Sequence, residues 1–293
     1  MAPSASAILE LLRPKQWTKN LLLFAALLFS GSFLDLQKDL STGLALLVFV
    51  LLSCSVYAFN DVHDLESDRR HPQKKNRPLA SGRMSPSLAL GLSLGLLLLG
   101  LGLSLILGLP FFFAALGYLA SSTAYTLWLK HEVILDVFFL AAGFVIRAVA
   151  GGLAIDVRIS PWLLVCTTLL ALFLALSKRR AEVEMLQGGA KSHRKVLAEY
   201  APALLDQMIG IVASATVVAY SLYAFSMHAA ASGPWMMLTV PFVLYGIFRY
   251  LYLSHQKGMA GSPELILLKD RPMQLNLLFW VLSAAAILYC GKL

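Results

Sequence analysis

Long apolar segments alternate with short polar ones along almost the whole chain. Two of them, residues 88–109 and 209–231, are nearly unbroken, without the period-two alternation of a membrane β-strand. A helix that crosses a bilayer needs about 20 mostly apolar residues. The pattern therefore predicts nine membrane-spanning helices, at about residues 20–35, 41–59, 87–108, 111–129, 134–155, 160–177, 206–229, 234–253 and 274–290.

Composition places the chain in the same class. Of its 293 residues, 58% are hydrophobic and only 14% are charged, and the mean hydropathy is +0.73. A soluble domain is typically about 25% charged. We therefore expect an all-α integral membrane protein, a multi-pass protein of the cell membrane.

The positive charges are distributed very unevenly between the two ends of the expected helices. If the N-terminus is cytoplasmic, almost all of the 24 Lys and Arg residues fall in cytoplasmic loops, and the exceptions are Lys38, Arg147, Arg158 and Lys292. Cytoplasmic loops of membrane proteins carry such an excess. We therefore attribute the net charge of +8 to membrane topology and to binding of membrane lipids and anionic substrates, and we expect no nucleic-acid partner. The long polar loops are on the cytoplasmic side, so we expect the site there.

The richest polar stretch follows the second expected helix. On a helical wheel Asn60, Asp64, Asp68 and Asp61 fall within an arc of about 100°. Three carboxylates that share one face repel one another unless a cation neutralises them. Oxygen ligands of this kind suit Mg²⁺, which often bridges to substrate phosphates. The alternative is an ordinary solvated loop.

Two basic stretches are candidates for phosphate binding. Lys75 and Arg77 follow the acids directly, although positive-inside retention or attraction to anionic lipids would also explain them. After the sixth expected helix, Lys178, Arg179 and Glu182 share an arc of about 100°, with Arg180 and Glu184 on the other side. We therefore favour Glu182 over Glu184 as a site residue.

Charged residues also occur within the expected membrane spans. Asp136 and Arg147 lie about 20° apart on the wheel of the fifth helix. Intramembrane charges are costly and usually mark function, so Arg147 is expected to face an anion. The fourth helix ends in Tyr125 and Lys130, which are candidate site residues. Tyr and Trp are also common as interface anchors at such a helix end.

These motifs resemble the UbiA-type prenyltransferases. Asn60, Asp64 and Asp68 are similar to the family's first acidic motif, and both the 75–79 segment Lys-Asn-Arg-Pro-Leu and the Tyr125–Lys130 ending fit it. The resemblance implies one transmembrane domain over residues 1–293, a helical bundle around a central cavity. It also implies that Mg²⁺ at the acidic motif holds a diphosphate.

One departure from the family pattern narrows the resemblance. Most members carry a second aspartate-rich motif after the sixth helix, where this chain has Lys-Arg-Arg-Ala-Glu at 178–182. That segment, the 13–20 segment that contains Lys19, and the 143–148 segment around Arg147 resemble the decaprenyl-phosphate phosphoribosyltransferases. In that branch phosphoribosyl diphosphate is the donor and a polyprenyl phosphate is the acceptor.

The main hypothesis is therefore Mg²⁺-dependent transfer of a 5-phosphoribosyl group to a polyprenyl phosphate in cell-wall biogenesis. Asn60, Asp61, Asp64 and Asp68 are the expected metal ligands, and the three aspartates are the expected catalytic residues. The expected substrate-binding residues are Lys19, Asn60, Lys75, Arg77, Tyr125, Lys130, Asp136, Arg147, Lys178, Arg179 and Glu182. A prenyltransferase with an aromatic or other acceptor and a lipid or solute transporter are the alternatives, and a homo-oligomer is compatible with the sequence.

Overall fold

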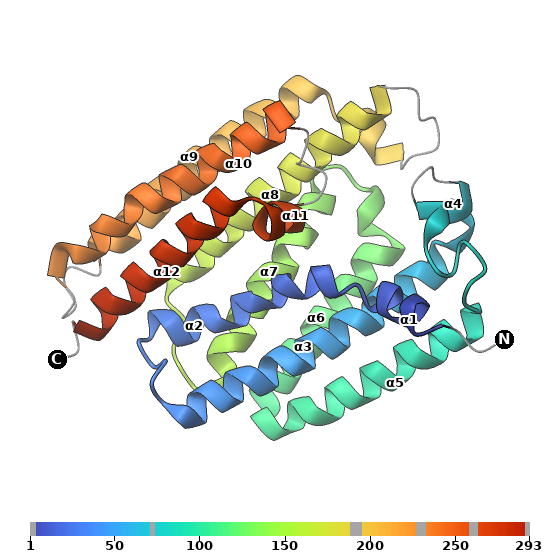
Figure 1. Cartoon of the computed structure of the whole chain (residues 1–293), viewed down its shortest axis with the longest axis horizontal. Coiled ribbons are helices and arrows are strands. Elements are labelled where there is room, and N and C mark those ends of the chain that lie inside the picture. The colour runs from blue at the N-terminus through green and yellow to red at the C-terminus, as the bar shows by residue number, and fades with distance from the viewer. Residues whose placement is uncertain (1–3, 71–73, 188–194, 227–232, 258–262, 291–293) are drawn as a thin grey trace.

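The protein is an elongated bundle of helices, seen here in a computed structural model (Figure 1). The structure describes residues 4–70, 74–187, 195–226, 233–257 and 263–290, and no strand occurs among them. Its α-helices are α1 (Ala5–Leu12), α2 (Phe24–Phe29), α3 (Leu36–His63), α4 (Leu65–Arg70), α5 (Pro86–Ser104), α6 (Leu109–Leu127), α7 (Leu135–Ala154), α8 (Pro161–Gln187), α9 (Pro202–Ser226), α10 (Val240–Lys257), α11 (Pro263–Lys269) and α12 (Arg271–Cys290). Short 3-10 helices connect them: η1 (Pro14–Leu23), η2 (Lys74–Asn76), η3 (Leu105–Leu107), η4 (Leu129–His131), η5 (Lys195–Glu199) and η7 (Gly233–Thr239). The all-α prediction is confirmed for this part of the chain.

Local sequence signals set several of the helix boundaries. The Asp35 carboxylate caps α3 by accepting from the backbone N–H groups of Gln37 and Lys38, at 3.0 and 3.3 Å. The turn predicted between the third and fourth apolar segments is present, because Gly108 adopts a φ of 95° immediately before α6. A side chain at that position would be strained, so the glycine permits the sharp reversal.

Seven helices in the described part of the chain are long and apolar enough to cross a membrane. Helix α6 is not among them, although it has 19 residues and coincides with a predicted span. Residues 20–35 also differ from the prediction, because they form the end of η1, the six-residue α2 and a non-helical stretch. The count of nine membrane-spanning helices is therefore not confirmed, whereas the multi-pass character is.

The helices differ in how deeply they lie in the bundle. Among the seven candidate spans, α3 and α7 are the most buried: half of the most apolar stretch of each lies inside the protein. For α5 and α12 the buried share of that stretch is only 17%. Figure 1 shows α3 and α5 along one side of the bundle, and α10 packs against both α9 and α12 on the other. The outer helices thus present apolar surface to lipid, and the polar side chains of α3 and α7 meet inside.

Candidate functional site

The acidic stretch, residues 60–68, begins at the C-terminal end of α3 and continues into α4. The backbone N–H of Asp64 donates to the carbonyl of Asn60, and that of Asp68 donates to the carbonyl of Asp64, both at 2.8 Å. These are helix-type bonds between residues four apart, so helical spacing is kept across the joint between α3 and α4. The side chains therefore project in the directions that the wheel gives them.

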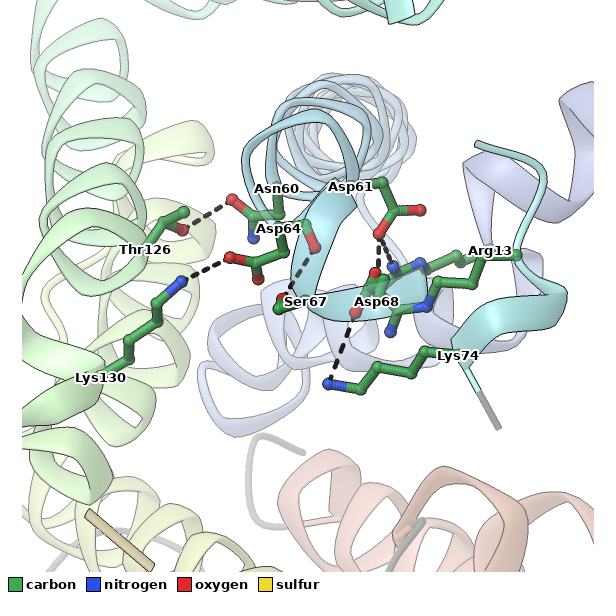
Figure 2. Close-up of polar contacts among 10 residues, drawn as sticks. Arg13, Asn60, Asp61, Asp64, Ser67, Asp68, Lys74, Thr126 and Lys130 are labelled. Carbon is green, nitrogen blue, oxygen red and sulfur yellow. Dashed lines mark hydrogen bonds and ion pairs between the residues drawn. The ribbon is translucent and has the colours of Figure 1, made fainter. Parts of the chain in front are cut away.

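Asp61 and Asp68 point to the same side and share one cation. The Arg77 Nη1 atom donates to Asp61 Oδ1 at 2.9 Å and to Asp68 Oδ2 at 2.6 Å. Both carboxylates are buried. On the other Asp68 oxygen, Lys74 Nζ lies at 3.9 Å (Figure 2). Two buried carboxylates thus converge on a single positive centre.

Arg13, which the sequence analysis does not name as a site residue, contacts the acidic stretch. It follows α1, has a left-handed φ of 51°, and donates from its guanidinium to Asp61 Oδ1. The guanidinium also stacks over the Tyr57 ring, 5.1 Å from the centroid. Burial lowers the pKa of Arg13, but an arginine stays protonated at neutral pH. The two partners are 48 positions apart, so no local sequence pattern connects them.

Asn60 and Asp64 point the other way, toward α6 and η4 (Figure 2). Lys130 Nζ donates to Asp64 Oδ1 at 2.7 Å, and the Thr126 hydroxyl donates to Asn60 Oδ1 at 2.6 Å. Lys130 is only 6% exposed. The end of the fourth expected helix therefore contacts the acidic stretch through Lys130.

The predicted arc of four oxygen ligands is therefore divided in two. The wheel places Asp61 only about 20° from Asp68, but it places Asp64 about 40° from both Asn60 and Asp68, so the tertiary partners Arg77 and Lys130 determine the division. Each of the three aspartates pairs with at least one cation. Over the residues that the structure describes, no three His, Cys, Asp or Glu side chains gather around a common centre that could hold a metal. The metal ligand set remains a prediction.

A second buried cluster surrounds Arg179 on α8. Its guanidinium donates to Asp136, to Glu182 and, at 2.8 Å, to the Tyr125 hydroxyl. Tyr200 donates to the second Asp136 oxygen at 2.7 Å. Burial, with the hydrogen bond to Asp136 as the next cause, raises the pKa of Tyr200, so its hydroxyl remains a neutral donor. Four of the predicted residues are joined here, and Tyr200 was missed.

The helical wheel also predicted correctly which side chains stay outside this cluster. Arg180 faces the opposite side of α8, where it pairs with Glu184 at 3.3 Å and with Asp206 at 2.9 Å. Glu184 is 69% exposed, whereas the Glu182 side chain is 28% exposed. Glu182 is thus the glutamate that joins the buried network.

Three predicted lysines are less clearly placed in the site. Lys19 on η1 and Lys178 on α8 are half-buried, and Lys75 on η2 is exposed. The neighbouring Lys74 is the lysine within ion-pair distance of Asp68. For this loop the structure therefore favours Lys74 over Lys75 as the side chain beside the acidic stretch.

Arg147 lies within α7 and is 5% exposed. As expected for an intramembrane charge, it and Asp136 both face the interior of the bundle. They are eleven residues apart, about 16 Å along the helix, so they belong to different clusters. Arg147 contacts Asn20, Ser53, Tyr118 and the carbonyl of Gly143.

The chain is similar to known proteins over most of its length. The family model described as the UbiA prenyltransferase family matches residues 21–268. The chain belongs to the UbiA prenyltransferase family. The decaprenyl-phosphate phosphoribosyltransferase of Mycolicibacterium smegmatis is 36% identical to it over 97% of this chain and 93% of the relative. The enzyme of that name from Mycobacterium tuberculosis is 34% identical over 98% of this chain and 95% of the relative.

Solved structures of UbiA homologues have the same fold. The homologue from Archaeoglobus fulgidus bound to GPP and Mg²⁺ superimposes with a TM-score of 0.73 over 96% of this chain and 99% of that one. At 20% sequence identity, this likeness concerns the fold. The predicted family and the predicted likeness to the phosphoribosyltransferase branch are both confirmed.

Proposed function

We propose that this UbiA protein transfers a 5-phosphoribosyl group from phosphoribosyl diphosphate to a polyprenyl phosphate. A phosphate oxygen of the lipid forms a bond to the anomeric carbon, the bond from that carbon to the diphosphate breaks, and pyrophosphate leaves. The attacking phosphate is already anionic, so the reaction requires no strong general base. The product is a polyprenyl-phosphate ribose that keeps its 5-phosphate.

The observation that carries this proposal is the likeness to phosphoribosyltransferases over nearly the whole length of both chains. The 36% identity extends over 97% of this chain. In place of the family's second aspartate-rich motif, this chain has the segment 178–182. In that segment Arg179 is buried, and Asp136, Glu182 and Tyr125 hold it in place. A fixed guanidinium at this position suits a donor that carries a second phosphate in addition to its diphosphate.

The cations around the acidic stretch support the same kind of substrate. Arg13, Lys74, Arg77 and Lys130 all pair with its aspartates in the structure. A diphosphate that enters with a metal ion offers these cations new anionic partners. We propose that the side chains then exchange the aspartates for phosphate oxygens, which holds the leaving group while its negative charge develops.

A divalent metal fits the donors of this stretch. Asp61 and Asp68 already converge on one positive atom, Arg77 Nη1, and all candidate donors are oxygens, which Mg²⁺ prefers. We propose that these two aspartates hold Mg²⁺, and that Asn60 and Asp64 join them once Thr126 and Lys130 release their oxygens. When bound, the ion would neutralise the diphosphate and favour its departure.

The remaining predicted residues have proposed roles around the donor. Arg179 and Glu182 would bind the ribose or its 5-phosphate, with Lys178 nearby on the same helix. Lys19, half-buried on η1, and Lys75, exposed on η2, are proposed as further cations around the donor. The isoprenoid tail would leave a central cavity between the helices into lipid.

We also propose an orientation in the membrane. The N-terminus and the acidic stretch would face the cytoplasm, since the excess of Lys and Arg lies at that end of the predicted spans. With α6 and the η1–α2 segment counted as crossings, the chain would cross the membrane nine times. A water-soluble donor such as phosphoribosyl diphosphate would then reach the site directly from the cytoplasm.

Purified protein in detergent tests the site. With Mg²⁺, labelled phosphoribosyl diphosphate and a polyprenyl phosphate, the Asp64→Asn variant should lose at least about a hundredfold in rate, because it removes a proposed metal ligand. Asp206→Asn is the matched control, because Asp206 pairs with Arg180 on the exposed side of α8. Full activity in the Asp64 variant would contradict the metal assignment.

A further inference from the structure

The surroundings of Arg147 contain only neutral partners. Its Nε donates to Asn20 Oδ1 at 2.7 Å and its Nη1 to the Gly143 carbonyl at 2.7 Å. Its Nη2 donates to the Tyr118 hydroxyl at 3.0 Å and, over a longer 3.4 Å, to Ser53. The Tyr118 ring covers one face of the guanidinium, 4.6 Å from its centroid.

The charge of Arg147 has no counterion in the described part of the chain, where no carboxylate lies within ion-pair distance of it. Arg179, by contrast, is paired with both Asp136 and Glu182. An unpaired guanidinium in the middle of an apolar span is costly. The positive charge of Arg147 could therefore be neutralised by one anion from outside the protein.

Asn20 provides a second and independent sign of a missing ligand. Its side chain is fully buried, and its Nδ2 group has no hydrogen-bond partner. The amide orientation is fixed, because Arg147 and Ser53 both donate to its Oδ1. A buried amide N–H₂ without an acceptor is rare, because the group loses its hydrogen bonds to water and gains none in exchange, so this group also requires an acceptor.

Close backbone packing places Asn20 beside Arg147. A side chain at Gly151 would lie 2.2 Å from the Leu23 carbonyl oxygen, so only glycine allows η1 to approach α7 this closely. Asn20 precedes Leu23 by three residues, and Arg147 precedes Gly151 by four. Each polar residue therefore lies about one turn from this contact, which brings them together.

We propose that Arg147 and Asn20 form a buried seat for a phosphate group, with Arg147 supplying the charge and Asn20 Nδ2 a further hydrogen bond. On α3, Ser53 lies seven residues before Asn60, so the seat is about 10 Å from the acidic stretch. It would hold a different phosphate from the one at the metal. This inference rests on the proposed function, because that reaction brings three phosphate-bearing groups together.

The occupied seat requires only a small exchange of contacts. The phosphate oxygens take the place of the Ser53 and Tyr118 hydroxyls at Nη2, which are neutral acceptors and the two longest bonds that the guanidinium makes. An anionic acceptor adds a direct Coulomb attraction to the guanidinium that the neutral hydroxyls lack. The phosphate belongs either to the acceptor lipid or to the 5-position of the donor.

Asn20→Asp separates this seat from a purely structural role. An aspartate would give Arg147 its own counterion, so a structural role predicts unchanged or higher stability and unchanged binding. A phosphate seat predicts equal or higher stability together with a loss of binding, because the new carboxylate repels the ligand. Asn20→Ala removes the donor without adding charge, and Thr239→Val is a control for a change in a buried polar contact elsewhere.

Equilibrium binding of three labelled probes, each alone with Mg²⁺, provides the test: decaprenyl phosphate, phosphoribosyl diphosphate and geranyl diphosphate. We expect Asn20→Ala to weaken one probe about tenfold and Asn20→Asp to weaken it at least about a hundredfold, with the melting temperature of unliganded Asn20→Asp at or above that of the wild type. The probe that is affected identifies the source of the phosphate.

Two results would overturn the seat. One is binding of all three probes by Asn20→Asp as tightly as by the wild type. The other is a melting temperature of Asn20→Asp far below that of the wild type. Failure of the proposed function is a separate result: the wild type would not transfer the phosphoribosyl group, yet decaprenyl phosphate binding would still depend on Asn20.

Discussion

Replacing Asp136 with asparagine removes one of the two carboxylates that neutralise Arg179. Both side chains of the pair are almost completely buried, with 1% of Arg179 and none of Asp136 exposed. An asparagine keeps the shape but not the charge. Its amide would either turn an N–H₂ group toward the guanidinium or lose the hydrogen bond from Tyr200.

The size of the effect follows from what remains around Arg179. Breaking a buried ion pair by removing one partner costs about 3–5 kcal/mol. Glu182 still neutralises the guanidinium, so we expect the lower end, about 3 kcal/mol. Glu182→Gln should cost about 1 kcal/mol, since Glu182 is 28% exposed and Asp136 remains. Asp206→Asn, at an exposed pair, should cost less than about 1 kcal/mol.

Reversible unfolding in mixed micelles, followed by circular dichroism, measures these differences in the free energy of unfolding. The rate of phosphoribosyl transfer is measured on the same variants. Glu182→Gln should lose this activity while remaining nearly as stable as the wild type. A loss of stability in Asp136→Asn no greater than that in Asp206→Asn would refute the reasoning. The buried pair would then contribute nothing beyond a surface one.

Three further predictions concern packing, binding and the metal. Gly151→Ala should destabilise the fold by about 2 kcal/mol because its Cβ would meet the Leu23 carbonyl, whereas Gly95→Ala, which meets nothing within 4 Å, should not; equal melting temperatures would contradict this. Arg13→Gln should raise the KM for phosphoribosyl diphosphate about tenfold, and an unchanged KM would exclude Arg13 from the site. The same change should not weaken Mg²⁺ binding, since Arg13 competes with the metal for Asp61. Chelation with EDTA should abolish transfer and added Mg²⁺ should restore it; full activity in EDTA would remove the metal from the account.

Much of the fold could be predicted because membrane spans leave a strong local signal. Helix α7, expected at residues 134–155, extends over Leu135–Ala154. The segment at 20–35 could not be predicted in the same way. Its path depends on the contact between the Leu23 carbonyl and Gly151, which joins parts of the chain that are distant in sequence.

In the candidate site, too, contacts set by local helical spacing could be predicted and tertiary contacts could not. The placement of Arg179 and Glu182 on one side of α8 and of Arg180 on the other follows from helical spacing, so the wheel predicted it. The pairing of Arg13 with Asp61 and of Lys130 with Asp64 is tertiary. No periodicity in the sequence contains that information, which explains why Arg13 was missed.

Incubation of the purified wild-type protein with two sets of substrates, each with Mg²⁺, tests the central claim most directly. One set contains labelled phosphoribosyl diphosphate and decaprenyl phosphate, and the other contains a prenyl diphosphate and 4-hydroxybenzoate. We predict label in the organic-soluble lipid of the first set, with one pyrophosphate released per lipid formed, and no product in the second. A prenylated aromatic product in the second set, with none in the first, would contradict the account.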